Sequence, residues 1–268
     1  MSPHPIERLR WVARAQGAGP SVLAREAAAA LASVGDDPAA LVTGCRRIIE
    51  RHPAAGPLWW LAARMLASGE PVHEAWAAAE EIDGDETAGV LAAHLPDDAT
   101  VTVLGWPELA ADALRRRGDV EALVVDVRGE GSQLVGALEA SGIDAYDVMQ
   151  PGLGAAVQES AIVLLEAEAV GPASFVASCG SLAAAGLGRS LGREVWLVAG
   201  VGRVLPGRLW DALASRVVGA DDPWDLDVDI VPLEWVTTVA GPSGPQPVEE
   251  AVRRADCPIV PELLRWEK

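Results

Sequence analysis

The sequence predicts an α/β protein with a helical N-terminal domain, residues 1–84, and a Rossmann-like domain with a parallel sheet, residues 85–268. Up to about residue 82, apolar residues recur with helical spacing between proline and glycine breaks. From about residue 98, short apolar runs alternate with amphipathic stretches. Near-continuous apolar strands separated by helices are typical of a parallel sheet that helices cover on both faces.

The helices expected in the first domain cover residues 6–16 and 21–34, a third stretch that starts at Pro38 and precedes the break at residues 56–57, and then residues 58–66 and 71–82. Asp37 and Pro38 begin the third, because aspartate caps helix N-termini and proline suits the first helical position. Leu41, Cys45 and Ile48 share one apolar face of that helix. We therefore expect Cys45 to lie in the core.

The second domain should alternate strands and helices. Strands are expected at 99–105, 121–128, 143–149, 160–167 and 193–200, and helices at 107–118, 132–142 and 181–192. Ligands of such sheets bind beyond the carboxyl ends of the strands. This rule selects the segments 105–106, 126–128, 166–168 and 200–203 as parts of a site.

The charge balance argues against nucleic acid and membrane as partners. The formal net charge is −18, and the longest basic cluster is Arg115–Arg117 on a helix that also carries acid. The sequence contains no stretch of 18 apolar residues, so no membrane span is predicted. Because the N-terminal segment lacks an apolar signal core, we expect a cytoplasmic protein.

Cysteine and histidine are sparse and scattered. The 3 cysteines show no Cys-x-x-Cys spacing, and the 4 histidines, the last of them His94, lie early in the chain without ligand-like spacing. We therefore expect neither a disulfide framework nor a metal, and no cofactor.

Four segments, in this order, carry a resemblance to a known family: ERHPAAGPLWWLAARML, VVDVRGEGSQLVGALEASGI, LLEAEAVGPASFVASCGSLAAAGLG and DIVPLEWVTTVAG. The chain resembles the family of the alpha, beta and delta regulatory subunits of eukaryotic initiation factor 2B. That family also includes isomerases of methylthioribose 1-phosphate and ribose 1,5-bisphosphate. The resemblance sets the first of these segments against the family's Arg-x-Pro-Thr segment and places Arg128 on its Glu-Ser-Arg-Pro arginine, and it implies a pocket for a phosphorylated ligand.

The departures from the family pattern concern its chemistry. The isomerases carry a cysteine after the first strand, where this chain has Gly105 and Trp106. Their aspartate aligns with Glu168, their Asn-Lys pair with residues 177–178, and their Gly-Thr pair with residues 180–181. The resemblance thus implies a retained pocket with altered chemistry.

Glu168 is the residue expected to act as an acid or base. Glu166 lies two residues before it, so both side chains share one face of a strand. A neighbouring carboxylate and partial burial would raise the pKa of one member of the pair. We place Glu168 just beyond the strand end. The structural alternative is that both residues cap strand-end amides or pair with an arginine such as Arg128.

The other candidates have structural alternatives too. Gly180 and Ser181 open a helix and can bind phosphate, or Ser181 can simply cap it. Cys179, beside that helix N-terminus, is an activated thiol or, as we expect, a core residue. Arg203 supplies charge to an anion or forms a surface ion pair. The residues expected to contact a ligand are Gly105, Arg128, Glu166, Gly180, Ser181 and Arg203.

Two functions follow from these residues. The first is a divergent member that binds a phosphorylated sugar or nucleotide metabolite without the cysteine-dependent isomerase chemistry. The alternative is an aldose–ketose isomerase of a sugar phosphate with Glu168 as acid and base. A second copy of the chain is also expected as a partner, with an apolar interface supplied by tryptophans late in the sequence, at positions 196, 210, 224 and 235.

Overall fold

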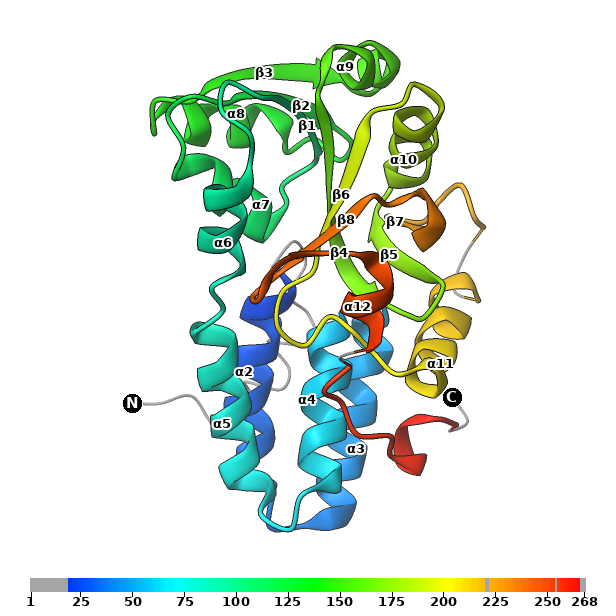
Figure 1. Ribbon diagram of the computed structural model, residues 1–268. Helices are drawn as coiled ribbons and strands as arrows, with labels where there is room; N and C mark the ends of the chain where they lie inside the picture. The colour runs from blue at the N-terminus through cyan, green and yellow to red at the C-terminus, as the bar shows by residue number, and fades with distance from the viewer. Residues whose placement is uncertain (1–18, 220–221, 254, 266–268) are drawn as a thin grey trace.

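A computed structural model describes residues 19–219, 222–253 and 255–265. The helix expected at residues 6–16 lies outside this part. Four helices form a bundle in the lower half of Figure 1: α2 (Pro20–Ala32), α3 (Pro38–Arg51), α4 (Gly56–Ala67) and α5 (Pro71–Asp83). Asp37 caps α3 by accepting hydrogen bonds from the backbone amides of Ala39 and Ala40, as expected.

The bundle has an apolar core that continues into the sheet. Trp59 of α4 is completely buried within it, and Cys45 is 1% exposed, which confirms its core position. The same cluster of side chains includes Ala169 and Val176 from two strands of the sheet. Bundle and sheet are therefore packed against each other through a shared core.

The strands of the second domain lie above the bundle in Figure 1. Its elements are α6 (Thr87–His94), β1 (Thr100–Leu104), α7 (Glu108–Arg115), β2 (Glu121–Asp126), α8 (Gly131–Glu139), β3 (Asp144–Met149), α9 (Leu153–Glu159), β4 (Ile162–Val170), β5 (Ser174–Ser178), α10 (Ser181–Ser190), β6 (Glu194–Val198), α11 (Gly207–Val218), β7 (Val228–Pro232), β8 (Thr238–Gly241), β9 (Gly244–Gln246) and α12 (Val248–Arg253). Short 3-10 helices lie at Gln150–Gly152, Leu233–Trp235 and Pro261–Leu263. The expected strands correspond to β1, β2, β3, β4 and β6, and the α/β class is confirmed.

The strand order creates a switch point in the sheet. The order is β3-β2-β1-β4-β6-β8-β9, and all neighbours from β3 to β8 are parallel. The chain moves outward from β1 to β3 and then returns to place β4 on the other side of β1. Open α/β sheets bind ligands where the order reverses in this way, at the carboxyl ends of the strands. Here that place is between β1 and β4.

β4 is longer than the sequence predicts. It continues to Val170 and pairs through a tight turn with the antiparallel strand β5, which in turn pairs with β7. Gly171 is required in this turn because a Cβ atom there would lie 2.2 Å from Cδ2 of Trp210. Glu168 is therefore inside the strand, and its expected place beyond the strand end is wrong.

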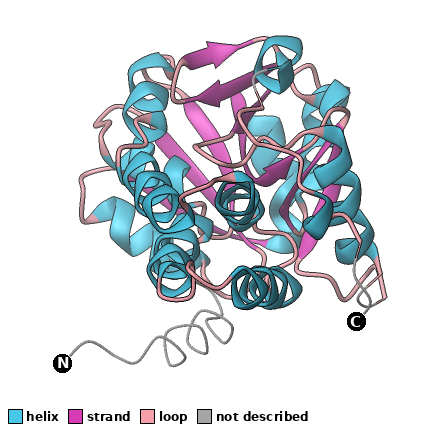
Figure 2. Cartoon of the chain, turned by 90° about the horizontal axis from the view of Figure 1, so that it is seen from below, coloured by secondary structure: helices cyan, strands magenta, loops and turns pink. Residues whose placement is uncertain are grey.

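The molecule viewed from below shows the bundle helices in front of the strands (Figure 2). In the part of the chain that the structure describes, no helix is long and apolar enough to cross a membrane.

Candidate functional site

A cleft of about 1430 Å³ opens at the carboxyl ends of β1, β2 and β4. The bundle forms one wall, with Gly19–Leu23 except Ser21 and with Arg51–Ala55. The loops after β1 and β2, and the outer half of β4, form the other. The cleft thus lies at the switch point of the sheet, where the topology predicts a ligand.

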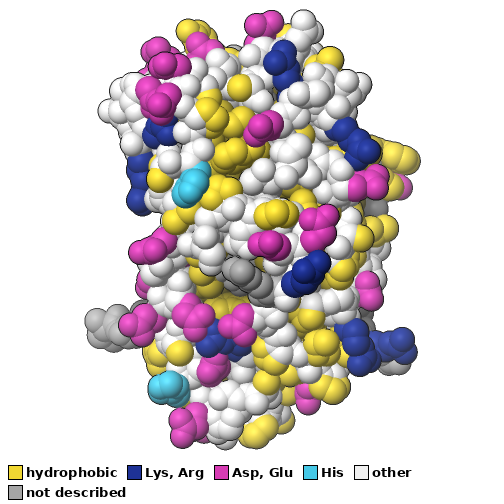
Figure 3. Space-filling view, in the orientation of Figure 1, with side chains coloured by type: hydrophobic (Ala, Val, Ile, Leu, Met, Phe, Trp, Pro, Cys, Tyr) yellow, Lys and Arg dark blue, Asp and Glu magenta, His cyan; other side chains and the backbone are white. Residues whose placement is uncertain are grey.

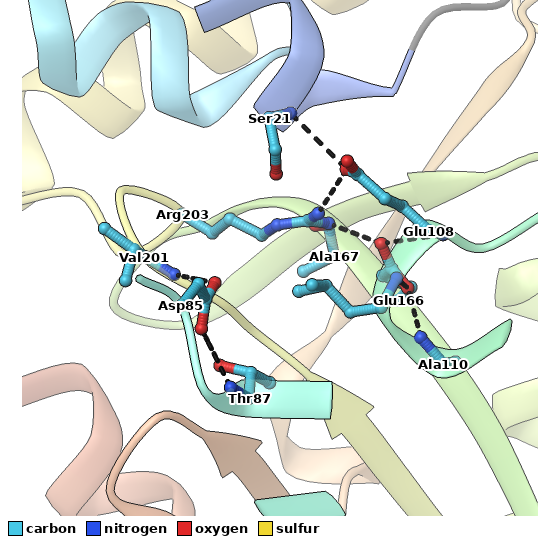
Figure 4. A network of polar contacts seen from close by, with 10 residues as sticks. Ser21, Asp85, Thr87, Glu108, Ala110, Glu166, Ala167, Val201 and Arg203 are labelled. Carbon is cyan, nitrogen blue, oxygen red and sulfur yellow. Dashed lines mark hydrogen bonds and ion pairs between the residues drawn. The ribbon is translucent and has the colours of Figure 1, made fainter. Parts of the chain in front are cut away.

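Glu166 holds the first turn of α7 (Figure 4). Its carboxylate accepts hydrogen bonds from the backbone amides of Glu108, Leu109 and Ala110 at 3.1, 2.8 and 2.9 Å. A negative charge is stabilised at a helix N-terminus, where the backbone amides have no partner within the helix. Burial raises the pKa of Glu166, although Arg203 and these amides oppose the shift. The expected capping of strand-end amides is wrong for Glu166, because its amide partners belong to α7. Its expected pairing with an arginine is found, with Arg203 in place of Arg128.

Arg203 is a buried counter-ion, with a side chain that is 1% exposed. Its Nη1 lies 2.9 Å from Oε1 of Glu166, and its Nη2 lies 3.3 Å from Oε2 of Glu108. Nη1 also donates to the carbonyl of Ala167. The expected surface ion pair is therefore wrong. Arg203 does not line the cleft, so the direct ligand contact expected of it has no support. Its ion pairs hold Glu108 and Glu166, which do line the cleft, in position.

Glu168 lies partly buried in the cleft wall, on the same face of β4 as Glu166. Burial raises its pKa to about 7, with Arg203 opposing and Glu166 reinforcing the shift. Among the residues that the structure describes, none lies within hydrogen-bond or ion-pair distance of its carboxylate. An acid with this pKa exists in both protonation states near neutral pH, as acid–base chemistry requires.

Arg128 lies on the cleft wall after β2, with weak ionic contacts at 3.8 Å to Glu130 and 3.9 Å to Asp227. Asp126 orders the loop that carries it, because its Oδ1 accepts hydrogen bonds from the backbone amides of Arg128, Gly129 and Glu130. These distances leave the Arg128 guanidinium free to meet an anionic ligand.

The N-terminus of α10 is partly occupied. Oδ2 of Asp229 accepts a hydrogen bond of 2.9 Å from the amide of Leu182, and Gly180 is the N-cap, with φ +88°. Capping by Ser181 is therefore wrong, since Ser181 is the first helical residue. Ser181 lines the cleft, but a phosphate at this helix end would meet the charge of Asp229. Gly180 and Gly105 shape their turns without lining the cleft.

Cys179 is neither a buried core residue nor an activated thiol. Its side chain is half-buried and does not line the cleft. Burial and the neighbouring Asp229 raise its pKa, so the helix N-terminus does not produce a thiolate. The chain therefore offers no cysteine at the site in place of the one that the family's isomerases carry.

No family model matches the chain, and no curated protein does. Solved structures match along almost its whole length. Translation initiation factor eIF-2B from Pyrococcus horikoshii OT3 has a TM-score of 0.76 at 15% identity, over 94% of this chain and 100% of that one. eIF2B beta from Chaetomium thermophilum has a TM-score of 0.72 at 17% identity, over 97% of this chain and 91% of that one. The tetrameric eIF2B beta2-delta2 complex from the same organism has a TM-score of 0.73 at 18% identity, over 93% of each chain. The chain has the eIF2B fold.

Two cleft residues, Arg51 and His52, were not among the expected ligand contacts. Both lie at the end of α3 and line the cleft opposite the sheet. The signal was in the sequence, because Arg51 begins the segment that resembles the family's Arg-x-Pro-Thr. Ser178, in the place of the family's Asn-Lys pair, also lines the cleft, whereas Ala177 is buried in β5.

Surface charge and possible metal ligands were also compared with what a nucleic-acid site or a metal site needs. Figure 3 shows Lys and Arg side chains scattered among Asp and Glu on the face in view, without a continuous basic patch. Within residues 19–265, apart from the few that the structure leaves undescribed, no group of 3 or more His, Cys, Asp and Glu side chains is arranged to hold a metal ion.

Proposed function

We propose that the protein binds a phosphorylated sugar or nucleotide metabolite in the cleft between β1 and β4. One observation carries the proposal: an uncapped carboxylate, Glu168, shares a large cleft at the switch point with the arginines Arg51 and Arg128. Arginine guanidinium groups bind phosphate through paired, charge-assisted hydrogen bonds. The free carboxylate is suited to the hydroxyl groups of a sugar.

The absence of a cysteine beside the cleft supports binding without the family's cysteine-dependent isomerase chemistry. The position after β1 carries Trp106, and Cys179 has a raised pKa outside the cleft. The protein would then act by binding its ligand, in regulation or assembly.

A thermal-shift screen of sugar phosphates and nucleotides tests the proposal. A ligand present at 100 times its Kd stabilises the native state by about 2.7 kcal/mol, which is several degrees in Tm for a chain of this size. Arg51→Ala and Arg128→Ala should each lose most of this shift. Arg116→Ala, at the exposed C-cap of α7 where Arg116 pairs with Asp112, should retain it. No shift with any phosphorylated ligand would contradict the proposal.

Catalysis is the second candidate, and the raised pKa of Glu168 favours it. An aldose–ketose isomerase needs one group that removes a proton from carbon and returns it to the neighbouring carbon. Glu168→Gln keeps the shape and loses the proton transfer, so it should abolish turnover with little change in ligand affinity. Proton NMR of candidate sugar phosphates incubated with the protein measures the turnover. Unchanged spectra with a ligand that binds would exclude this function.

We also propose that the chain associates with a second copy through the sheet domain. The tetrameric Chaetomium complex is a precedent among proteins of this fold. The tryptophans do not supply the interface: Trp196 and Trp210 are buried, Trp235 is partly buried, and Trp224 alone of the four is exposed. Exposed leucines on α10, at positions 182 and 187, and at its C-cap, Leu191, are better suited.

A further inference from the structure

A second cavity, of about 380 Å³, lies between the bundle and the carboxyl ends of β6 and β8. Among the described residues, it shares no lining residue with the cleft at β1 and β4. Well-packed interiors have few voids larger than a water molecule, whereas small-molecule pockets occupy roughly 300–1,000 Å³. Val201, Val204 and Val239 give the cavity an apolar surface. It therefore has the size and the lining of a ligand site that the proposed function does not use.

The walls of this second cavity are held in place by contacts between distant segments. Oδ2 of Asp85 accepts a hydrogen bond of 2.9 Å from the amide of Val201 and so fixes the loop after β6 (Figure 4). The indole of Trp60 donates one of 2.8 Å to the backbone carbonyl of Asp256. Gly202, with φ +76°, packs on the same indole, because a Cβ atom there would lie 3.0 Å from Cε3. The cavity is thus pre-formed, as small-molecule sites usually are.

The ionisable side chains of the cavity are acidic. Glu81 and Asp256 line it, and no Lys, Arg or His does so among the described residues. Arg64 pairs with Glu81 and with Glu74, so these three side chains together keep one negative charge. The exposed carboxylate of Asp256 has no hydrogen-bond or ion-pair partner in the described part of the chain. The charge of the cavity therefore favours a cation.

Gln246 adds an unused acceptor to the lining. Its Oε1 is buried and has no hydrogen-bond partner among the described residues. An unsatisfied buried acceptor is unfavourable, so a donor that satisfies it gains binding free energy. A half-turn of the terminal amide exchanges the positions of its oxygen and nitrogen, since the two atoms have nearly the same shape. The amide can therefore present an acceptor to a donor in the cavity.

We propose that the second cavity binds a small aliphatic amine, protonated at neutral pH, with a short methylene chain. An ammonium group has three donors and no acceptor, which matches the Asp256 carboxylate and the Gln246 oxygen. The methylene chain covers the valines and removes their apolar surface from water. A neutral alcohol lacks the charge, and a carboxylate would be repelled by Asp256. The proposal goes beyond the proposed function, because it concerns a separate site.

NMR titration of the nitrogen-labelled protein with pentylamine, 1-pentanol and pentanoate tests this proposal. Pentylamine should shift the signals of the Trp60 indole and the Gly202 amide in a saturable way. It should bind about 10-fold more tightly than 1-pentanol, because hydrogen bonds to charged groups are stronger, and pentanoate should not bind. Asp256→Asn should weaken pentylamine binding roughly 2- to 5-fold, the range of a solvent-accessible ion pair, and leave 1-pentanol binding unchanged.

Two further variants complete the test. Asp211→Asn is the matched control, because Asp211 is exposed on α11 and does not line the cavity, so both affinities should stay the same. Ala251→Leu adds bulk to the α12 side of the cavity and should weaken pentylamine and 1-pentanol alike.

Three results would overturn the proposal. The first is equal affinity for pentylamine and 1-pentanol, or an amine affinity that Asp256→Asn leaves unchanged. The second is a set of shifts confined to cleft residues such as Arg128, which would place the amine in the other cavity. The third is the lack of a saturable shift with any probe. None of them affects the proposed function, which is tested with phosphorylated ligands in the cleft.

Discussion

At the scale of single residues, the protonation of Glu168 couples the site to pH. Burial raises its pKa from the usual 4.5 to about 7. Between these values the folded protein holds a proton that the unfolded chain releases, so the unfolding free energy falls as pH rises. The stabilisation that this bound proton gives is complete below the pKa of Glu168 in the unfolded chain, and it is lost as the pH rises through the pKa of Glu168 in the folded protein.

Glu168→Gln removes the carboxyl group that binds this proton in the folded protein. The Tm of the variant minus that of the wild type should therefore increase from about pH 5 to about pH 8. Circular dichroism during heating at a series of pH values measures the difference. Glu139→Gln, at the exposed end of α8, is the control for the loss of a surface carboxylate. A difference for Glu168→Gln that stays constant over this pH range would show that the Glu168 carboxyl group has an ordinary pKa.

Arg203 is the residue whose loss should cost the most stability. Removing one partner of a buried ion pair costs about 3–5 kcal/mol, because the other charge stays buried without compensation. Arg203→Met should destabilise the fold by this amount in urea unfolding, since the Glu166 side chain is only 7% exposed. The double variant with Glu166→Gln should recover part of the loss. A loss no greater than that of the surface variant Arg116→Ala would contradict the central role of this pair.

At the scale of elements, α4 and β4 approach each other closely beside the cleft. Gly56, the first residue of α4, lies so close to β4 that a Cβ atom there would be 2.7 Å from the carbonyl oxygen of Glu168. Gly56→Ala should therefore force the two elements apart and destabilise the fold by about 1–3 kcal/mol. Gly69→Ala is the control, because nothing lies within 4 Å of its added methyl group. Equal urea midpoints for the two variants would show that the contact is not constraining.

The sequence predicted the elements whose signals are local. Pro38, Pro57 and Pro71 mark helix starts, and the apolar runs of β1, β2, β4 and β6 are continuous enough to be recognised. The strand β5 was not predicted, because it has only 5 residues and its small residues Ser174, Ala177 and Ser178 give no clear strand pattern. It is defined by pairing with its neighbour β4 and with β7, about 50 residues further along the chain. The helix α6 was not predicted either, because it carries small and apolar residues on all sides and lacks an amphipathic pattern.

The distinction between local sequence signals and contacts made only by the fold applies to the site as well. That Glu166 and Glu168 face one way follows from the period of a strand, and the structure agrees. Their different roles do not follow from the sequence, because Arg203 and the first turn of α7 reach Glu166 only through the fold. Arg51 reaches the cleft for the same reason, from a helix more than 100 residues before Glu168.

At the scale of the whole molecule, self-association is the first property to measure. Sedimentation equilibrium at micromolar concentration should give a mass near twice 27.9 kDa. Leu187→Glu on α10 should shift the mass to that of a single chain, because a charge in an apolar interface is costly to bury. Leu31→Ala would test stability and not association, since that residue is buried in the bundle. A wild type that sediments only as a single chain would exclude the dimer.

The central claim is that the cleft at the switch point of the sheet receives a phosphorylated metabolite. The most direct measurement is a crystal structure of the protein with the ligand that raises its Tm most in the thermal-shift screen. The account predicts the phosphate within hydrogen-bond distance of Arg51 or Arg128 and a ligand hydroxyl on the carboxylate of Glu168. A ligand bound elsewhere on the molecule, with the cleft filled by solvent alone, would contradict the account.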